Sequence, residues 1–255
     1  MCNSDLRDLV LAGIHWELTD VPLVMAAAAR AATVQNDAPS PQPARTQTSI
    51  VPPIAPQQSI SVETATAMAA RPADMDALCR MISEFNHPLR AGVTNVVLPH
   101  VAQRPNGLVV VTDIPSGDDD ASGRLLSGAA GELLDKMLAA IGMSRDTVSI
   151  VPLLFWRTPG GRTPTDGELE LARPFVNRIF EMLKPRFILT LGTLAAMRVA
   201  NATLPRAHGA TVALENGVTA MPIYHPNYLM LKPAAKRDAW TALQTVQNLL
   251  NSADK

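Results

Sequence analysis

The sequence predicts an α/β domain in three layers, αβα, in which helices cover both faces of a central, mostly parallel four-stranded sheet. Short, continuous apolar runs rich in β-branched residues, such as GLVVVT at 107–112, are typical of parallel strands buried on both faces. Segments with apolar residues at steps of three and four alternate with those runs and indicate helices. Strands that alternate with helices favour a parallel sheet.

The expected elements follow one another from residue 74 to residue 250. The first helix, at 74–85, carries apolar residues at helical steps, and strand 107–112 comes after it. Lys184-Pro185 ends the helix expected at 172–183, because the residue before a proline disfavours the helical conformation. The other expected elements are helix 131–141, strands 148–154 and 186–191, helix 194–200, a short strand at 220–223 and helix 236–250.

Two segments precede this domain, which we place at 74–255. Residues 1–33 include a short amphipathic helix, expected at 6–16. Residues 34–73 are rich in Pro, Ala, Ser, Thr and Gln, with seven prolines between Pro39 and Pro72. Such a composition buries too little apolar surface to offset the entropy of ordering, so a disordered linker is expected.

The bulk composition is that of an ordinary core-forming protein, with 47% hydrophobic and 18% charged residues. No run of about 18 apolar residues and no basic, apolar leader occurs, which predicts a cytoplasmic protein with no membrane partner. The two cysteines, Cys2 and Cys79, are too few for a disulfide framework or a cysteine-rich metal site.

Charge is distributed unevenly along the domain. Residues 74–156 hold 6 basic and 10 acidic residues, whereas residues 157–255 hold 12 basic and 7 acidic residues. A basic face can bind a phosphate backbone. Scattered solubilising charge explains the same counts, so both interpretations stay open.

Ligands of parallel α/β sheets bind beyond the carboxyl ends of the strands, which here are the loops at 113–128, 155–165, 192 onward and 225–229. Asp113 directly follows a strand, where a carboxylate can orient a water molecule. For the three acids at 118–120 we favour a solvated turn that caps the next helix.

His225 is the second candidate for chemistry. It follows the short strand at 220–223, precedes Pro226, and lies between Tyr224 and Tyr228, the only tyrosines of the chain. A lone histidine is often structural. A histidine held by a following proline at the carboxyl edge of a sheet can instead present a ring nitrogen to a ligand.

Together these segments resemble the thermostable, iron-sulphur branch of the uracil-DNA glycosylases, often called family 4. That family carries G-E-x-P-G after its first strand, where this chain has T-D-I-P-S at 112–116. Its G-x-P-F-V-G-x-A-G-x-L-L-D is answered by G-R-L-L-S-G-A-A-G-E-L-L-D at 123–135, and its R-P-P-G-N-R-x-P-T by R-T-P-G-G-R-T-P-T at 157–165. The blocks L-G and H-P-x-Y-L stand intact at 191–192 and 225–229.

The resemblance implies a uracil-DNA glycosylase-like fold that flips a base out of DNA and hydrolyses its N-glycosidic bond, the first step of base-excision repair. His225 would donate a hydrogen bond to the base carbonyl, and Asp113 would orient water or stabilise the cationic sugar. The implied base pocket contains Ile114, Pro115, Leu126 and Pro152. The implied DNA contacts are Arg157, Arg162, Pro226, Asn227, Tyr228, Lys232, Lys236 and Arg237, with residues 226–231 helping to wedge the duplex.

The four cluster cysteines of that family correspond to Glu84, His87, Trp156 and Ala172. A cluster requires thiolate ligands, so no iron-sulphur cluster, other cofactor or metal is expected. His87 is then expected to be a surface or capping residue. Packing of Trp156 and Phe85 can replace the connections that the cluster makes.

The pocket departs from the family as well. Leu126 replaces a base-stacking phenylalanine, and Pro152 replaces the asparagine that reads the uracil edge. Thr112 and Ser116 replace two glycines and would crowd the approach to the sugar. Recognition of a base by hydrogen bonds is therefore expected to be weak or altered.

Two functional hypotheses follow, with a monomer and single- or double-stranded DNA as partner in each. The first is a divergent glycosylase acting on uracil or another damaged base. The alternative is a catalytically inactive protein of the same fold that serves as a DNA-binding or regulatory module. A generic α/β domain that binds some other small ligand is a third interpretation.

Overall fold

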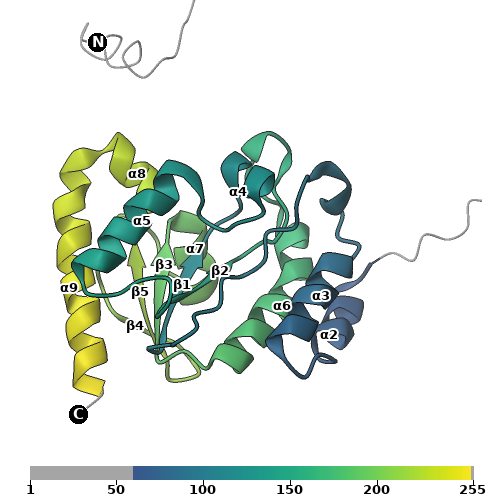
Figure 1. Cartoon of the computed structure of the whole chain (residues 1–255), viewed down its shortest axis with the longest axis horizontal. Coiled ribbons are helices and arrows are strands. Elements are labelled where there is room, and N and C mark those ends of the chain that lie inside the picture. Colours follow the sequence, from purple (N-terminus) through teal and green to yellow (C-terminus); the bar gives the residue numbers. More distant parts are fainter. Residues whose placement is uncertain (1–59, 254–255) are drawn as a thin grey trace, which may run out of the picture. The chain divides into compact units, whose positions relative to one another are not determined.

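A computed structural model of the chain describes residues 60–253, which form a sheet flanked by helices (Figure 1). The strand order is β2-β1-β3-β5-β4. The first four strands in this order run parallel, and β4 pairs antiparallel with β5. The strands are β1 (Leu108–Thr112), β2 (Ser149–Pro152), β3 (Phe187–Leu191), β4 (Val212–Ala213) and β5 (Thr219–Ile223). The expected mostly parallel sheet is confirmed, with a fifth strand that we did not predict.

Side chains of successive strand residues enter two different cores, one on each face of the sheet. Along β1, Val109 and Val111 belong to one core, whereas Leu108 and Val110 belong to the other. Because successive side chains of a strand point to opposite faces, burial on both faces produces the continuous apolar run seen in the sequence. The expected three-layer arrangement is thus confirmed.

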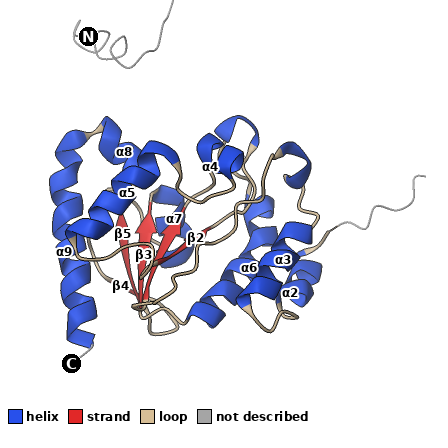
Figure 2. Ribbon diagram, in the orientation of Figure 1, coloured by secondary structure: helices blue, strands red, loops and turns tan. Residues whose placement is uncertain are grey.

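Helices pack on each face, and two short helices lie at the carboxyl edge. The core containing Val109 draws on α2 (Val62–Ala69), α3 (Met75–Glu84), α6 (Asp166–Leu183) and α7 (Thr193–Ala200). The core containing Val110 draws on α5 (Gly128–Ala140) and α9 (Lys236–Ala253). In Figure 2 the arrowheads of β1, β3 and β5 point toward the end where α4 (Gly117–Ser122) and α8 (Pro226–Leu231) lie. The 3-10 turns are η1 (Arg90–Gly92), η2 (Pro159–Gly161) and η3 (Pro233–Ala235).

Helix α2 lies inside the stretch that we expected to be linker. Ser61 caps this helix by accepting the backbone N–H of Thr64, and Ala65 and Ala69 are buried against α6. The composition of this stretch does not reveal the helix, because alanine counts little as apolar surface yet loses no side-chain entropy when it packs closely against a neighbouring helix. The helix expected at 6–16 and the rest of the linker lie outside the described residues.

Helix α6 begins earlier than the sequence pattern predicts. Thr165 and Glu168 form a reciprocal capping box at its start, so the helix begins at Asp166 rather than at Ala172. It ends at Leu183, as predicted, and Lys184 follows in the left-handed conformation before Pro185. Within residues 60–253, no helix is long and apolar enough to cross a membrane.

Candidate active site

The ends of four parallel strands form one row at the carboxyl edge of the sheet. Thr112 of β1 is in register with Pro152 of β2 and Leu191 of β3, and Leu191 is in register with Ile223 of β5. The residues that follow these strand ends are therefore neighbours in space. They include both sequence-predicted candidates for chemistry, Asp113 and His225.

His225 is the N-cap residue of helix α8, and this position determines which ring nitrogen carries a proton. Its Nδ1 accepts the backbone N–H of Asn227 at 3.2 Å, so Nδ1 bears no hydrogen. Burial lowers the pKa of His225 to about 4, although the negative charge of Asp119 acts in the opposite direction. At neutral pH the ring is uncharged and its proton is on Nε2, which lies 3.2 Å from Oγ1 of Thr112. His225 is a neutral hydrogen-bond donor.

Asp113 lies against the start of helix α7. Its Oδ1 accepts the backbone N–H of Ala195 at 2.6 Å. Gly192 makes this approach possible, because a Cβ at that residue would lie 2.4 Å from Oδ2 of Asp113. Burial raises the pKa of Asp113 to about 6, while the hydrogen bonds from the backbone of Ala195 and Leu194 act to lower it. The carboxylate is mostly ionised only above that pH.

Two of the three acids that follow, Asp119 and Asp120, have structural roles in a buried setting. Asp119 forms a capping box with Ser116, and its Oδ1 accepts the N–H and the Oγ–H of Ser127 at 2.7 and 2.9 Å. Asp120 accepts the N–H groups of Thr94 and Asn95. Helix capping by this segment was expected, but Asp119 and Asp120 are buried rather than solvated, because backbone donors surround them.

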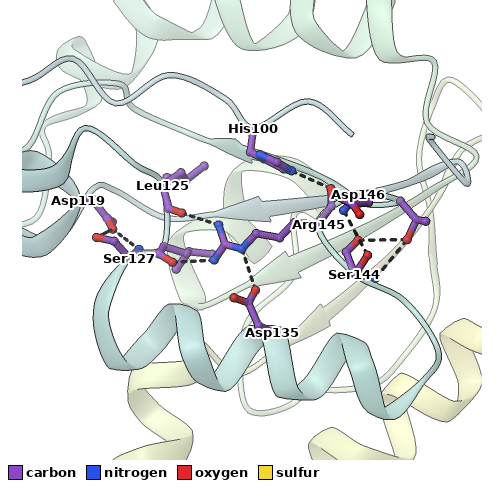
Figure 3. A network of polar contacts seen from close by, with 10 residues as sticks. His100, Asp119, Leu125, Ser127, Asp135, Ser144, Arg145 and Asp146 are labelled. Carbon is purple, nitrogen blue, oxygen red and sulfur yellow. Dashed lines mark hydrogen bonds and ion pairs between the residues drawn. The ribbon is translucent and has the colours of Figure 1, made fainter. Parts of the chain in front are cut away.

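A network around Arg145 holds the loop between α4 and α5, which carries Leu126 (Figure 3). The guanidinium donates to the carbonyl oxygens of Leu125 and Leu126 at 2.8 and 2.7 Å and to Oδ1 of Asp135 at 2.7 Å. Leu126 adopts a left-handed backbone with φ of 49°, which is unfavourable for a branched residue. Gly131 is required beneath this loop, since a Cβ there would lie 1.7 Å from the carbonyl oxygen of Leu126.

Replacing Arg145 with alanine is expected to lower the free energy of unfolding by about 2 to 3 kcal/mol, because two carbonyls lose charge-assisted hydrogen bonds. Urea denaturation measures this change. The matched control is Arg104→Ala, whose ion pair with Asp146 is exposed and 3.8 Å long, so that a change below about 0.5 kcal/mol is expected. Equal losses in the two variants would contradict the role we give to Arg145.

The predicted base-pocket residues line the same edge. Ile114 and Pro115 directly follow β1, and Pro152 is the last residue of β2. Leu126 is buried in the core on the α5 face, together with Leu191 and Ile223. Because alternate residues of β1 face that same core, Thr112 also points to the α5 face.

The predicted DNA-contact residues fall into three groups. Pro226, Asn227 and Tyr228 belong to α8, and Lys232, Lys236 and Arg237 follow it, all exposed except Pro226. Arg157 is half-buried, with its guanidinium beside Gly117 at the start of α4. Arg162 instead makes a two-pronged ion pair with Glu168 near the start of α6, which lowers the pKa of Glu168 to about 2. Arg162 is therefore already engaged in an ion pair.

An aromatic stack that was not predicted connects the loop before β4 with the end of β5 and with α8. The rings of His208 and Tyr224 stack with centroids 4.1 Å apart, and Tyr224 lies 4.6 Å from Tyr228. Nδ1 of His208 accepts the backbone N–H of Tyr224. Nothing near His208 in the sequence indicates this role, which depends on the return of a distant loop to β5. Leu231, at the end of α8, has 76% of its surface exposed.

A groove between α6 and α7 is lined by Glu170, Arg173 and Arg198, each of which is already in an ion pair. Glu170 and Arg173 pair at 2.6 Å, and Arg198 pairs with Asp166. At the sheet edge, by contrast, His225 and Asp113 have strongly displaced pKa values, which is typical of functional sites. We therefore place the candidate active site at the edge.

Two of the four positions that the resemblance aligns with cluster cysteines, His87 and Trp156, belong to a packed aromatic group. The rings of His87 and Trp156 stack with centroids 4.3 Å apart and planes 1° from parallel. His87 accepts the N–H of Leu89 at Nδ1, and its Nε2 lies 3.0 Å from the carbonyl oxygen of Glu168. Ala172 is buried and Glu84 is exposed. His87 caps a turn, as expected, but it is buried rather than at the surface, because both ring nitrogens have partners.

These residues do not fit an iron-sulphur cluster. Such a cluster requires thiolate ligands, and Cys79, which lies on α3, is the one cysteine among residues 60–253. Over the same residues, no group of three or more His, Cys, Asp or Glu side chains is arranged to hold a metal ion.

Replacing His87 with alanine is expected to lower the free energy of unfolding by about 2 to 4 kcal/mol, because the change leaves a cavity and removes the partners of the N–H of Leu89 and the carbonyl of Glu168. Glu84→Ala, at an exposed position of the same set, should change it by less than about 0.5 kcal/mol. Chemical denaturation at pH 7.5 tests both. Similar stability of the two variants would show that the aromatic group does not hold this part of the fold together.

The fold and the edge define a class of protein: a three-layer α/β domain with a neutral hydrogen-bond donor and a carboxylate of raised pKa at the carboxyl ends of its strands. A family model described as the Uracil DNA glycosylase superfamily matches residues 98–244. The chain belongs to this superfamily. The resemblance predicted from the five sequence blocks is thus confirmed.

Individual relatives agree with this membership. The chain is 34% identical over 154 residues to the type-4 uracil-DNA glycosylase of Archaeoglobus fulgidus, covering 57% of this chain and 77% of that protein. It is 31% identical over 177 residues to the protein of the same name from Pyrobaculum aerophilum, covering 64% and 88%. For the one from Thermotoga maritima the identity is 30% over 146 residues, covering 56% and 76%.

Proposed function

We propose that this protein is a DNA glycosylase that hydrolyses the N-glycosidic bond of uracil or another damaged base, the first step of base-excision repair. The observation that carries this proposal is the state of His225, a neutral imidazole whose proton is held on Nε2 at the edge of the sheet. Its superfamily and the activity named for its relatives support the proposal.

In this mechanism the target base leaves the base stack of the DNA. It enters the space between His225 and the loop that carries Leu126, at the carboxyl edge of the sheet. As the bond between C1′ of the sugar and the base nitrogen breaks, its electron pair goes to the base. The Nε2–H of His225 donates to the base carbonyl and stabilises that negative charge. The histidine does not need to be charged for this role, which suits its pKa of about 4.

Asp113 supplies the second part of the reaction. Its carboxylate stabilises the developing positive charge on the sugar and orients the attacking water. The water oxygen forms the new bond to C1′, and the carboxylate accepts the proton that the water loses. The burial that raises the pKa of Asp113 to about 6 makes it a stronger base than an exposed aspartate.

The DNA backbone is bound by the basic residues around the edge. Lys232, Lys236 and Arg237 are exposed next to α8 and can reach phosphates, and Arg157 can do so from the loop between β2 and α6. Leu231, the most exposed large apolar side chain among the described residues, is the candidate wedge that fills the gap left by the base. We expect the protein to act as a monomer and without an iron-sulphur cluster.

The double variant Lys236→Gln/Arg237→Gln is expected to lower the slope of log binding constant against log salt by roughly 2, since two phosphate contacts are lost. Fluorescence anisotropy with a labelled duplex at several salt concentrations measures the slope. Lys184→Gln, which changes an exposed lysine before β3 at the opposite edge of the sheet, should leave the slope unchanged. A similar drop in both would locate the DNA elsewhere.

The direct test of function uses purified protein on single- and double-stranded oligonucleotides that contain uracil, hypoxanthine or xanthine. Formation of abasic sites on at least one substrate is expected. The second candidate function, a DNA-binding module without activity, is favoured by Leu126 and Pro152, which offer neither an aromatic face nor an amide to the base. Retarded DNA in a gel with no abasic sites would support that alternative and exclude the enzyme.

A further inference from the structure

The proton of His225 already has a partner inside the protein. Because Nδ1 accepts from the backbone of Asn227, Nε2 is the nitrogen that donates, and the atom it meets is Oγ1 of Thr112 at 3.2 Å. A base carbonyl that uses this donor must therefore take it away from a threonine hydroxyl.

Thr112 has little freedom to move aside. It is the last residue of β1, paired on one side with Pro152 and on the other with Leu191. Its carbonyl oxygen accepts the N–H of Leu153 at 3.1 Å, and 1% of its surface is exposed. A β-branched side chain in this setting has few rotamers, so the hydroxyl remains directed at His225.

Exchange of partners also leaves the hydroxyl unsatisfied. Among the described residues, Oγ1 of Thr112 has one hydrogen-bond partner, which is His225. When Nε2 turns to a ligand, a buried hydroxyl loses its partner, and that loss opposes binding of the ligand. In the family block that this segment resembles, the corresponding residue is a glycine, which has no side chain to compete.

We propose that Thr112 is a specificity-determining residue whose hydroxyl competes with the base for the Nε2 proton of His225. This inference rests on the proposed function, since the competing ligand is the carbonyl of a flipped base. The hydroxyl selects for bases whose other contacts are strong enough to displace it from His225. It therefore lowers kcat/KM for uracil-containing DNA.

The test compares Thr112→Val, which keeps the shape of the side chain but removes the hydroxyl, with Thr112→Ala and Thr112→Ser. Removal of the hydroxyl in the valine and alanine variants should raise kcat/KM on uracil-containing DNA by roughly two- to tenfold, the effect of one neutral hydrogen bond. Thr112→Ser keeps the hydroxyl and should stay within about twofold of the parent protein. Thr112→Ala serves if the valine variant does not fold.

A second measurement reports on His225 without any catalysis. The ¹⁵N and ¹H resonances of the Nε2–H group, recorded by NMR, should move when the hydroxyl is removed and remain in place in Thr112→Ser. Titration with free uracil as the probe should then shift these resonances at lower uracil concentration in Thr112→Val than in the parent protein. A residue that only supports the fold would not produce this pattern.

The outcomes separate the two proposals. If the parent protein releases uracil and folded Thr112→Val and Thr112→Ala do so no faster, the competition is refuted and the glycosylase function stands. If none of the proteins forms abasic sites on uracil, hypoxanthine or xanthine but Thr112→Val binds free uracil more tightly than Thr112→Ser, the glycosylase function fails and the competition stands. If no protein forms abasic sites on uracil, hypoxanthine or xanthine and none binds free uracil, both proposals are lost.

Discussion

Replacing His225 with alanine is expected to reduce the rate of base release by about 10²- to 10³-fold, the loss associated with removal of one donor to a developing anion. This loss is expected because no other described side chain at this edge offers a donor where the Nε2–H group of His225 lies. Single-turnover formation of abasic sites at pH 7.5 measures the rate. A loss smaller than tenfold would exclude His225 as the group that stabilises the leaving base.

A matched variant separates this chemistry from the structural role of His225. The ring also caps α8 through the N–H of Asn227, so a lost cap could disturb the loop. His225→Asn retains a side-chain acceptor suited to this capping position. It should therefore keep the stability of the parent protein while losing activity as His225→Ala does.

The pH dependence of this contribution follows from the pKa of about 4. His225 is neutral in the native state above that pH, so the ratio of parent to His225→Ala rates should stay constant from about pH 5 to pH 9. The burial of His225 makes the native state less stable in acid, whereas a histidine that gains a negatively charged partner makes it more stable there. Because the native pKa lies below the ordinary value of 6.5, native stability is complete above pH 6.5 and falls as the pH drops toward 4.

Asp113→Asn is expected to lower the rate of base release by about 10²-fold or more. It should also remove the fall of this rate at low pH. In the parent protein the rate should rise tenfold per pH unit up to the pKa of Asp113, about 6, and then level off. The variant has no carboxylate to ionise, so its residual rate should be flat over this range. A pH–rate profile with the same inflection in both proteins would assign the ionisation to another group.

The same substitution is expected to stabilise the fold near neutral pH. The pKa of Asp113 is raised from 3.8 to about 6, so its contribution to stability is fully present below pH 3.8 and lost as the pH rises through 6. Above that, the buried negative charge costs up to about 3 kcal/mol. The amide introduced by Asp113→Asn would retain an oxygen for the N–H of Ala195 without the charge.

Urea denaturation at pH 4 and pH 7.5 tests this result. Asp113→Asn should be more stable than the parent protein at pH 7.5, and the difference should disappear near pH 4. Asp118→Asn, at the exposed acid of α4, is the control and should change little at either pH. A less stable Asp113→Asn at pH 7.5 would mean that the carboxylate is held favourably by the start of α7 and that burial does not dominate.

Much of the site could be placed from the sequence because parallel strands end at a common edge. Asp113 and His225 each follow a predicted strand, and the structure has both at the carboxyl edge. Their states were not predictable. The pKa of each depends on burial by distant elements, and the proton position of His225 depends on the helix that starts at Pro226, where we expected a loop.

Other features were missed because their partners are far away along the chain. Arg145 reaches carbonyls 20 and 19 residues earlier, at Leu125 and Leu126. His87 becomes buried when Glu168 and Trp156 close around it, although its neighbours Asn86 and Pro88 are exposed. No periodicity or turn signal encodes such contacts.

By itself, the sequence determined the class of fold, the order of its main strands and helices, and the superfamily, because hydrophobic periods and short motifs are local properties. The tertiary structure alone decided that Thr112 meets His225, a hydrogen bond between residues 113 positions apart. It also decided that the rings of His87 and Trp156 stack in a buried position. Both depend on which side chains the sheet and its covering helices bring within contact distance, and that distance is a property of the folded chain.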